Sequence, residues 1–124
     1  IQTMLNQFAA NPVVLAGDTH NAWAFNLQDE QRNPIGVEIG TPGITSPGME
    51  SFLPVEPQVL ANALMQSSPE LAALDTQHRG WAEIELTAGA MRAQWHFVSS
   101  VLERDYSVSQ SEPQICEAGA RRFT

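Results

Sequence analysis

Apolar and polar residues follow two different periods along the first part of the chain. Residues 1–10 place apolar side chains three and four positions apart, which predicts an amphipathic helix that ends before Pro12. The run Val13–Ala16 is apolar on both faces, so we expect a short buried strand with a parallel neighbour. Residues 22–39 hold two apolar segments around a polar turn, and this pattern predicts a β-hairpin.

The middle of the chain changes from irregular to helical patterns. Residues 41–57 contain four of the eight prolines, so we expect an irregular loop that is either functional or a packed lid. Residues 59–65 are expected to form a helix. Ser68, followed by a proline, has the pattern of a helix start, and residues 71–74 would form the body of this second short helix.

Residues 80–98 carry the strongest strand pattern of the chain. Apolar and polar side chains alternate on both sides of a turn at 87–90, which predicts a β-hairpin with one core face and one solvated face. Glu83 and Glu85 are expected on the solvated face. The expected core face carries Trp81, Ile84, Leu86, Met91, Ala93, Trp95 and Phe97. The polar segment 103–124 has little pattern, and we expect a tail that is disordered in part.

Composition and charge narrow the classes of function. The chain has 124 residues, 43% of them hydrophobic, which is enough for one domain with a core. Its formal net charge of −8 argues against binding to nucleic acid or to an anionic membrane surface. No apolar stretch approaches the ~20 residues of a membrane span. The single cysteine, Cys116, excludes an intramolecular disulfide and gives no zinc-ligand spacing.

The sequence Gly17-Asp18-Thr19-His20, directly after the first expected strand, is the main candidate for chemistry. In an extended chain, residues two apart face the same side, so Asp18 and His20 would both point at one cation. A carboxylate oxygen and a neutral imidazole nitrogen suit iron, zinc or manganese, and the carboxylate alone suits calcium. Two ligands do not complete a metal site. The alternative is a solvated turn in which Asp18 caps backbone N–H groups and His20 is exposed.

Three segments together resemble one known family. They are VVLAGDTHNAWAFNL at 13–27, GVEIGTPGITSPG at 36–48, and the stretch from SPELAALD to SVLERD at 68–105. In this order they resemble the carboxyl-terminal part of PhoD-type alkaline phosphatases, which belong to the calcineurin-like metallophosphoesterases. The combination is more specific than the GDTH sequence alone.

This resemblance implies an α/β fold, namely part of a two-sheet sandwich made mostly of β-hairpins with a few short helices. It also implies a phosphoester hydrolase with calcium and iron in its metal centre. A GD-x-H motif closes the catalytic domain in this family, so Asp18 and His20 would each ligate a metal, and Trp23 would pack beside the site. Members are typically exported, which implies a periplasmic or secreted protein that acts on a phosphate ester.

The chain also departs from the family pattern. The other ligand motifs of the family lie upstream of GD-x-H and are not in this chain, and Cys116 does not match the metal-binding cysteine. We therefore expect residues 1–105 to be the carboxyl-terminal portion of a catalytic domain, followed by a tail at 106–124, inactive alone and without an assigned catalytic residue. The alternative is a non-catalytic β-rich binding or interaction module. Neither the oligomeric state nor the substrate-binding residues follow from the sequence.

Three further residues are candidates for a role in the site. Arg79 matches the basic-Arg-Gly-aromatic start of the late hairpin in this family, where it would either clamp a phosphate or be an exposed arginine at a strand start. His96 lies opposite the apolar face of its strand, so we expect it to face solvent or to be covered by a neighbour. Ser46 matches a loop of the family, and we expect a turn there, since no base accompanies it.

Overall fold

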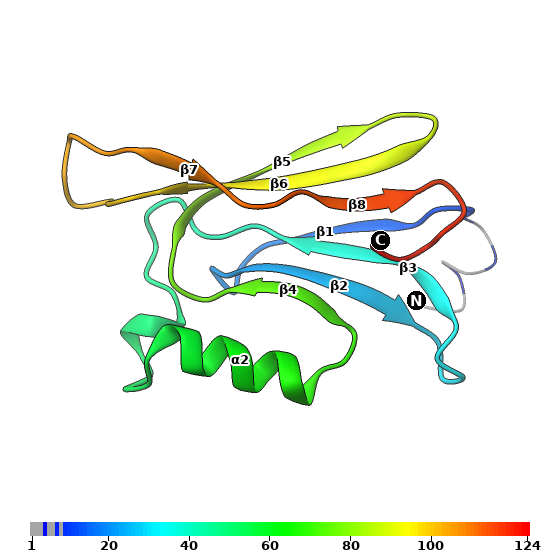
Figure 1. Cartoon of the computed structure of the whole chain (residues 1–124), viewed down its shortest axis with the longest axis horizontal. Helices are drawn as coiled ribbons and strands as arrows, with labels where there is room; N and C mark the ends of the chain where they lie inside the picture. Colours follow the sequence, from blue (N-terminus) through cyan, green and yellow to red (C-terminus); the bar gives the residue numbers. More distant parts are fainter. Residues whose placement is uncertain (1–3, 5–6, 8) are drawn as a thin grey trace.

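Two four-stranded β-sheets face each other in the computed structural model, which describes residues 4, 7 and 9–124 (Figure 1). The first sheet has the order β1-β3-β2-β4. Its strands are β1 (Val13–Ala16), β2 (Ala22–Gln28), β3 (Pro34–Gly40) and β4 (Leu71–Asp75). Between β3 and β4 lie the short 3-10 helix η1 (Met49–Ser51) and the helix α2 (Pro57–Ser67), which lies along β4.

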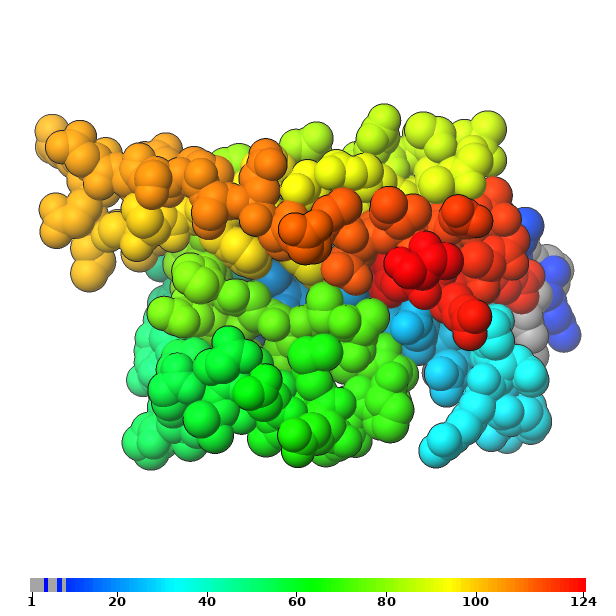
Figure 2. All heavy atoms as spheres, viewed as in Figure 1, coloured from blue at the N-terminus to red at the C-terminus, as the bar shows by residue number. Residues whose placement is uncertain are grey.

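The second sheet is antiparallel and is built around its longest strand. Its strands are β5 (Arg79–Leu86), β6 (Ala90–Val98), β7 (Val108–Gln110) and β8 (Gln114–Glu117). β5 pairs with β6 along its whole length, whereas β7 and β8 pair with two successive parts of β6. The segment between β6 and β7 projects beyond the rest of the molecule at the left of Figure 2.

The hydrophobic core lies between the two sheets. Its buried residues are Ala22, Ala24, Val37 and Ile39 from the first sheet and Met91, Ala93, Trp95 and Cys116 from the second. The Trp95 Nε1 donates a hydrogen bond of 2.9 Å to the carbonyl oxygen of Gly40. This polar contact therefore joins the two sheets in addition to their apolar packing.

Several predicted elements are confirmed. The hairpin expected over 22–39 is β2–β3, and the hairpin expected over 80–98 is β5–β6. The helix expected over 59–65 lies within α2, which starts with a proline and has Glu56 as its N-cap, accepting a hydrogen bond from the Val59 N–H. The helix expected over 1–10 falls largely outside the described residues.

Three expectations about individual elements are wrong. Residues 71–74 form a strand, not a helix, because antiparallel pairing with β2 supplies backbone hydrogen bonds that a helix of four residues cannot match. Val13–Ala16 does run parallel to β3, but it is an edge strand, and Leu15 is 64% exposed. Trp81 lies on the outer face with Glu83, because Ala82 and Ile84 occupy the inner positions of β5.

The carboxyl-terminal segment is also more regular than its composition suggests. β7 and β8 complete the second sheet, and Cys116 lies in the core with 5% of its surface exposed. The fold is thus a mostly β sandwich with one α-helix whose bounds fall within the described residues, and the α/β class applies only through the parallel β1–β3 pair and α2. Over the described part of the chain, no helix has the length and apolar character needed to cross a membrane.

Candidate metal-binding turn

The GDTH sequence forms a tight turn between β1 and β2. The Thr19 N–H donates to the carbonyl oxygen of Gly17 at 3.0 Å, and Asp18 between them has φ +75°, which is the geometry of a γ-turn with positive φ. His20 has φ +61°. Two residues with side chains are thus held in the left-handed region, where strain of roughly 1–3 kcal/mol each is typical of functional sites. The premise of an extended chain at Asp18 and His20 is wrong.

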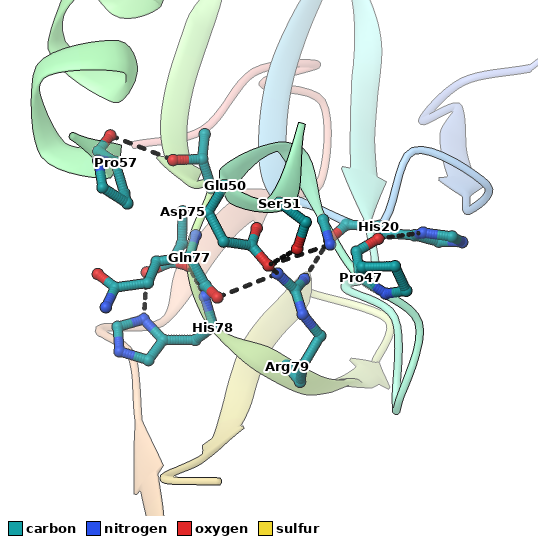
Figure 3. A network of polar contacts seen from close by, with 11 residues as sticks. His20, Pro47, Glu50, Ser51, Pro57, Asp75, Gln77, His78 and Arg79 are labelled. Carbon is teal, nitrogen blue, oxygen red and sulfur yellow. Dashed lines mark hydrogen bonds and ion pairs between the residues drawn. The ribbon is translucent and has the colours of Figure 1, made fainter. Parts of the chain in front are cut away.

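The imidazole of His20 is held from the loop that follows β3. Its Nδ1 lies 2.8 Å from the carbonyl oxygen of Pro47 (Figure 3). A Cβ at Gly43 would lie 3.4 Å from the Cγ of the ring, so this backbone also passes close to His20. Because a carbonyl only accepts, the Nδ1 carries a proton, and in the neutral form of the ring the lone pair is then on Nε2. A backbone carbonyl that accepts from the other ring nitrogen is a common partner of a metal-binding histidine.

The carboxylate of Asp18 is exposed at the tip of the turn. Within the described part of the chain it makes neither a hydrogen bond nor an ion pair, so the expected capping role is not what this structure shows. Asp18 therefore offers its oxygens to solvent or to a cation. Trp23, expected to pack beside the site, is half-buried, and its indole lies against Gly40 at the end of β3.

Arg79 is buried, with 6% of its surface exposed, and the expectation of an exposed arginine is wrong. Its Nη1 donates to the carbonyl oxygen of His20 at 2.7 Å. Its Nη2 donates to the carbonyl oxygen of Gln77 at 3.0 Å and lies 2.6 Å from Oε1 of Glu50. Because both terminal nitrogens bind protein oxygens, the alternative role of a phosphate clamp has no support here.

Glu50 is the second charge of this ion pair, and its side chain is partly buried, with 26% of its surface exposed. Its Oε1 accepts from the Gly48 N–H at 3.1 Å and from the Ser51 hydroxyl at 3.3 Å, besides the contact with Arg79. Burial opposes ionisation of Glu50, but the hydrogen bond from Arg79, the Gly48 N–H and the arginine charge outweigh it and lower the pKa of the carboxyl. The carboxylate is therefore charged at neutral pH.

Gly48 is required by this packing. A Cβ at this position would lie 2.6 Å from Oε2 of Glu50 and 2.7 Å from Nη1 of Arg79, closer than side chains approach in folded proteins. The glycine of the Thr45–Gly48 loop therefore lets the ion pair sit directly beneath the backbone. Ser46 lies in a bend of the same loop, and no base contacts it within the described part of the chain, as expected for a turn residue.

His96 was expected either to face solvent or to be covered by a neighbour, and the structure shows the second environment. Its ring stacks on Trp81 with centroids 4.9 Å apart, and its Nε2 lies 3.0 Å from Oε2 of Glu83 without hydrogen-bond alignment. His96 lies on the outer face of the second sheet. It therefore belongs to a different surface from the GDTH turn.

Two residues near the turn were not singled out from the sequence. Glu50 lies in the proline-rich loop, whose length was the only signal for it. Asn21 follows His20 and is completely buried. Its Oδ1 and Nδ2 have no hydrogen-bond partner in the described structure, so an unpaired amide lies buried beside the turn.

The described residues contain no cluster of three or more histidine, cysteine, aspartate or glutamate side chains placed to bind one metal ion. The turn therefore brings two candidate ligands, Asp18 and His20, and not a whole site. A hollow of about 540 Å³ lies at the other end of the first sheet, beside the β2–β3 turn. It is remote from both candidate ligands and has no evident relation to them.

Comparisons with known proteins identify a family and a shared fold. A family model described as PhoD-like phosphatase matches residues 1–95. A solved structure titled "Structure of PhoD" superposes with a TM-score of 0.76 over 99% of this chain at 18% identity, which shows a shared fold. The chain covers 24% of that protein, about a quarter of its length. A search of curated protein sequences found no match.

Proposed function

Because this chain belongs to the PhoD-like phosphatase family, we propose that it is a carboxyl-terminal piece of a metal-dependent phosphoester hydrolase and that Asp18 and His20 are two of its metal ligands. The observation that supports this role most directly is the 2.8 Å contact between His20 Nδ1 and the Pro47 carbonyl oxygen. It leaves the Nε2 lone pair for a metal. The exposed, uncommitted carboxylate of Asp18 adds an anionic oxygen in the same short turn.

The donor set fits the metals expected for the family. A carboxylate oxygen is a ligand for calcium, and an imidazole nitrogen suits iron or manganese, so Asp18 and His20 would serve different ions of one centre. Cations bound there would polarise phosphoryl oxygens and orient the attacking group. The part played by this chain is to present the two donors on a strained and well-braced turn.

The proposal also implies that the isolated chain has an incomplete metal site. A metal ion takes about four to eight donors, and the turn offers two. The remaining ligands would come from the rest of a PhoD-like protein, of which this chain corresponds to a quarter. We therefore expect the isolated chain to hydrolyse no phosphate ester. A periplasmic or secreted location, and alkaline phosphatase or phosphodiesterase activity, belong to the proposal for the whole protein.

Paramagnetic relaxation by manganese tests the ligand assignment, because it detects weak binding by an incomplete site. The amide spectrum of the ¹⁵N-labelled chain would be followed during a Mn²⁺ titration, with Asp18→Asn and His20→Ala measured in parallel. We expect the signals of residues 17–21 to broaden first, and each variant to need several-fold more Mn²⁺. Glu85→Gln, on the outer face of β5, is the matched control and should leave this broadening unchanged.

The alternative, a β-rich interaction module without a metal role, predicts a different result. Broadening would then follow exposed acidic residues such as Glu83 and Glu85 and would not change in Asp18→Asn or His20→Ala. That result would remove the metal-ligand assignment. Measurable hydrolysis of a chromogenic phosphate ester by the purified chain, persisting in both variants, would overturn the proposal that the activity needs the missing part.

A further inference from the structure

A single peptide group lies between the imidazole of His20 and the carboxylate of Glu50 (Figure 3). The Pro47 carbonyl and the Gly48 N–H belong to the same planar peptide unit. The carbonyl oxygen lies 2.8 Å from His20 Nδ1, and the N–H donates to Glu50 Oε1 at 3.1 Å. The carboxylate and the imidazole are thus connected by two hydrogen bonds through one peptide plane.

Arg79 braces both ends of this connection. Its Nη2 lies 2.6 Å from the same oxygen of Glu50, and its Nη1 donates to the backbone carbonyl of His20 at 2.7 Å. The guanidinium therefore fixes the backbone that carries the imidazole, and through Glu50 it also fixes the peptide that accepts the Nδ1 proton. Because arginine stays protonated and presents its donors in a rigid fork, it is suited to holding two acceptors in a fixed relation.

The charge of Glu50 acts on His20 through the peptide. A carboxylate that accepts from the N–H polarises the peptide group and makes its carbonyl oxygen a better acceptor. A stronger acceptor at Nδ1 favours the tautomer with the proton on Nδ1 and the lone pair on Nε2. Metal-binding histidines commonly contact a carboxylate directly for this purpose, and here a peptide group stands between the two.

We propose that Glu50 and Arg79 are positioning residues for His20, which act through the Pro47–Gly48 peptide to hold its Nε2 ready for a metal. The consequence for metal binding rests on the function proposed above, whereas the effect on the imidazole itself does not. Gly48 is part of this arrangement of Glu50, Arg79 and the Pro47–Gly48 peptide, since any side chain at Gly48 would collide with the guanidinium of Arg79.

The tautomer of His20 is the direct test, and it needs no metal. Long-range ¹H–¹⁵N spectra of the metal-free chain distinguish Nδ1–H from Nε2–H rings, and free histidine favours Nε2–H. We expect His20 to be mainly Nδ1–H in the parent chain. Glu50→Ala and Arg79→Gln should shift it substantially towards Nε2–H, and Glu50→Gln, whose amide oxygen still accepts from Gly48, should give an intermediate result.

The other histidines provide the internal control. His78 and His96 should keep their signals in the Glu50 variants, and Glu83→Gln should change His96 but not His20, since Glu83 lies beside the His96 ring. A merely structural role would lower the melting temperature and leave the His20 tautomer unchanged, and that result would overturn the proposal. A parent chain with His20 mainly Nε2–H would overturn it as well. If Arg79→Gln does not fold, the His20 tautomer in the two Glu50 variants tests the proposal.

The Mn²⁺ titration separates this inference from the proposed function. If both hold, Glu50→Ala should raise the Mn²⁺ concentration that broadens residues 17–21 about tenfold, as is common when an outer partner of a metal ligand is lost. If the tautomer shifts in the variants but the parent shows no broadening at the turn, the positioning role stands and the metal-ligand proposal fails. If the turn broadens equally in parent and variant, the positioning role in metal binding fails and the ligand assignment stands.

Discussion

The indole Nε1 of Trp95 donates a hydrogen bond of 2.9 Å to the carbonyl oxygen of Gly40, across the interface of the two sheets. Gly40 is the last residue of β3 and is followed by the loop that holds His20. The contact therefore ties the second sheet to the point where the first sheet leads into the candidate site. Both partners are buried, so water cannot replace either of them.

Replacing Trp95 with phenylalanine should destabilise the fold. The change removes part of a buried ring and leaves the Gly40 carbonyl without its donor, which together should lower the free energy of unfolding by about 2–4 kcal/mol. Urea unfolding followed by circular dichroism measures this loss. Trp81→Phe is the control, because Trp81 is 41% exposed on the outer face, and its loss should be clearly smaller. Equal losses would contradict a special role for the contact with Gly40.

An alanine at Gly40 should also be costly. A Cβ there would lie 2.8 Å from Cε2 of the Trp23 indole and nearer still to its Nε1 and Cδ1, so the ring would have to leave its position. We expect a loss of about 1–3 kcal/mol in urea unfolding. Gly89→Ala provides the comparison, since only the Thr87 hydroxyl, at 4.0 Å, would come near the new methyl group. A similar cost at both positions would show that the clash with Trp23 is not the cause.

Local patterns predicted the elements whose two faces differ in polarity. The hairpins β2–β3 and β5–β6 were predicted from alternation and turn composition, and the helix predicted over 59–65 lies within α2. Trp81 misled the prediction of the core face because a large aromatic residue was assumed to be buried. The alternation itself, with Ala82 and Ile84 on one face, would have placed Trp81 correctly on the other.

Elements that depend on a distant partner were not predicted. β4 was expected to be a helix, and the three residues of β7 are all exposed, so neither carries a pattern of its own. Both are strands because β2 and β6 offer free edges to them. The same holds for the site. The GDTH motif marked Asp18 and His20, but the hydrogen bond from Arg79 to His20 joins residues 59 positions apart, which no local pattern reveals.

The stability of the fold should depend on the ionisation of Glu50. Its pKa is lowered in the folded state from an ordinary value of 4.5, since the hydrogen bonds from Arg79 and Gly48 outweigh the effect of burial. Because this pKa is lower in the folded state, the Glu50 carboxylate of the unfolded chain is protonated first as the pH falls. The stabilisation is therefore complete above a pH of about 4.5 and disappears as the pH falls through the folded-state pKa.

Comparing the parent with Glu50→Gln isolates this contribution. Urea unfolding at several pH values between about 3 and 7 should show the parent more stable near neutral pH, with the gap closing at the acidic end. The pKa of Asp29 is also lowered, chiefly by its side-chain hydrogen bond with Asn33, so the parent alone reports more than one group. A gap that stays constant over the whole pH range would show that the charge of Glu50 does not stabilise the fold.

Truncation after residue 105 should abolish the native fold. The sequence suggested a domain over 1–105 followed by a tail, and on that view the truncated chain would fold normally. In the structure, however, the removed part includes β7 and β8, the buried thiol of Cys116, and Phe123, whose N–H donates to the side chain of Asn26 at 2.8 Å. Without it, the second sheet would keep only β5 and β6, and a two-stranded sheet is rarely stable in water.

The expected result is loss of the near-ultraviolet circular dichroism of the tryptophans and binding of a hydrophobic dye by the exposed inner face of β6. A second truncation, to residues 1–117, keeps β7 and β8 and loses the contact between Phe123 and Asn26. It should unfold cooperatively at a lower urea concentration than the parent. If the chain of residues 1–105 instead shows the same cooperative transition as the whole chain, the carboxyl-terminal strands are an addition to the fold and not part of it.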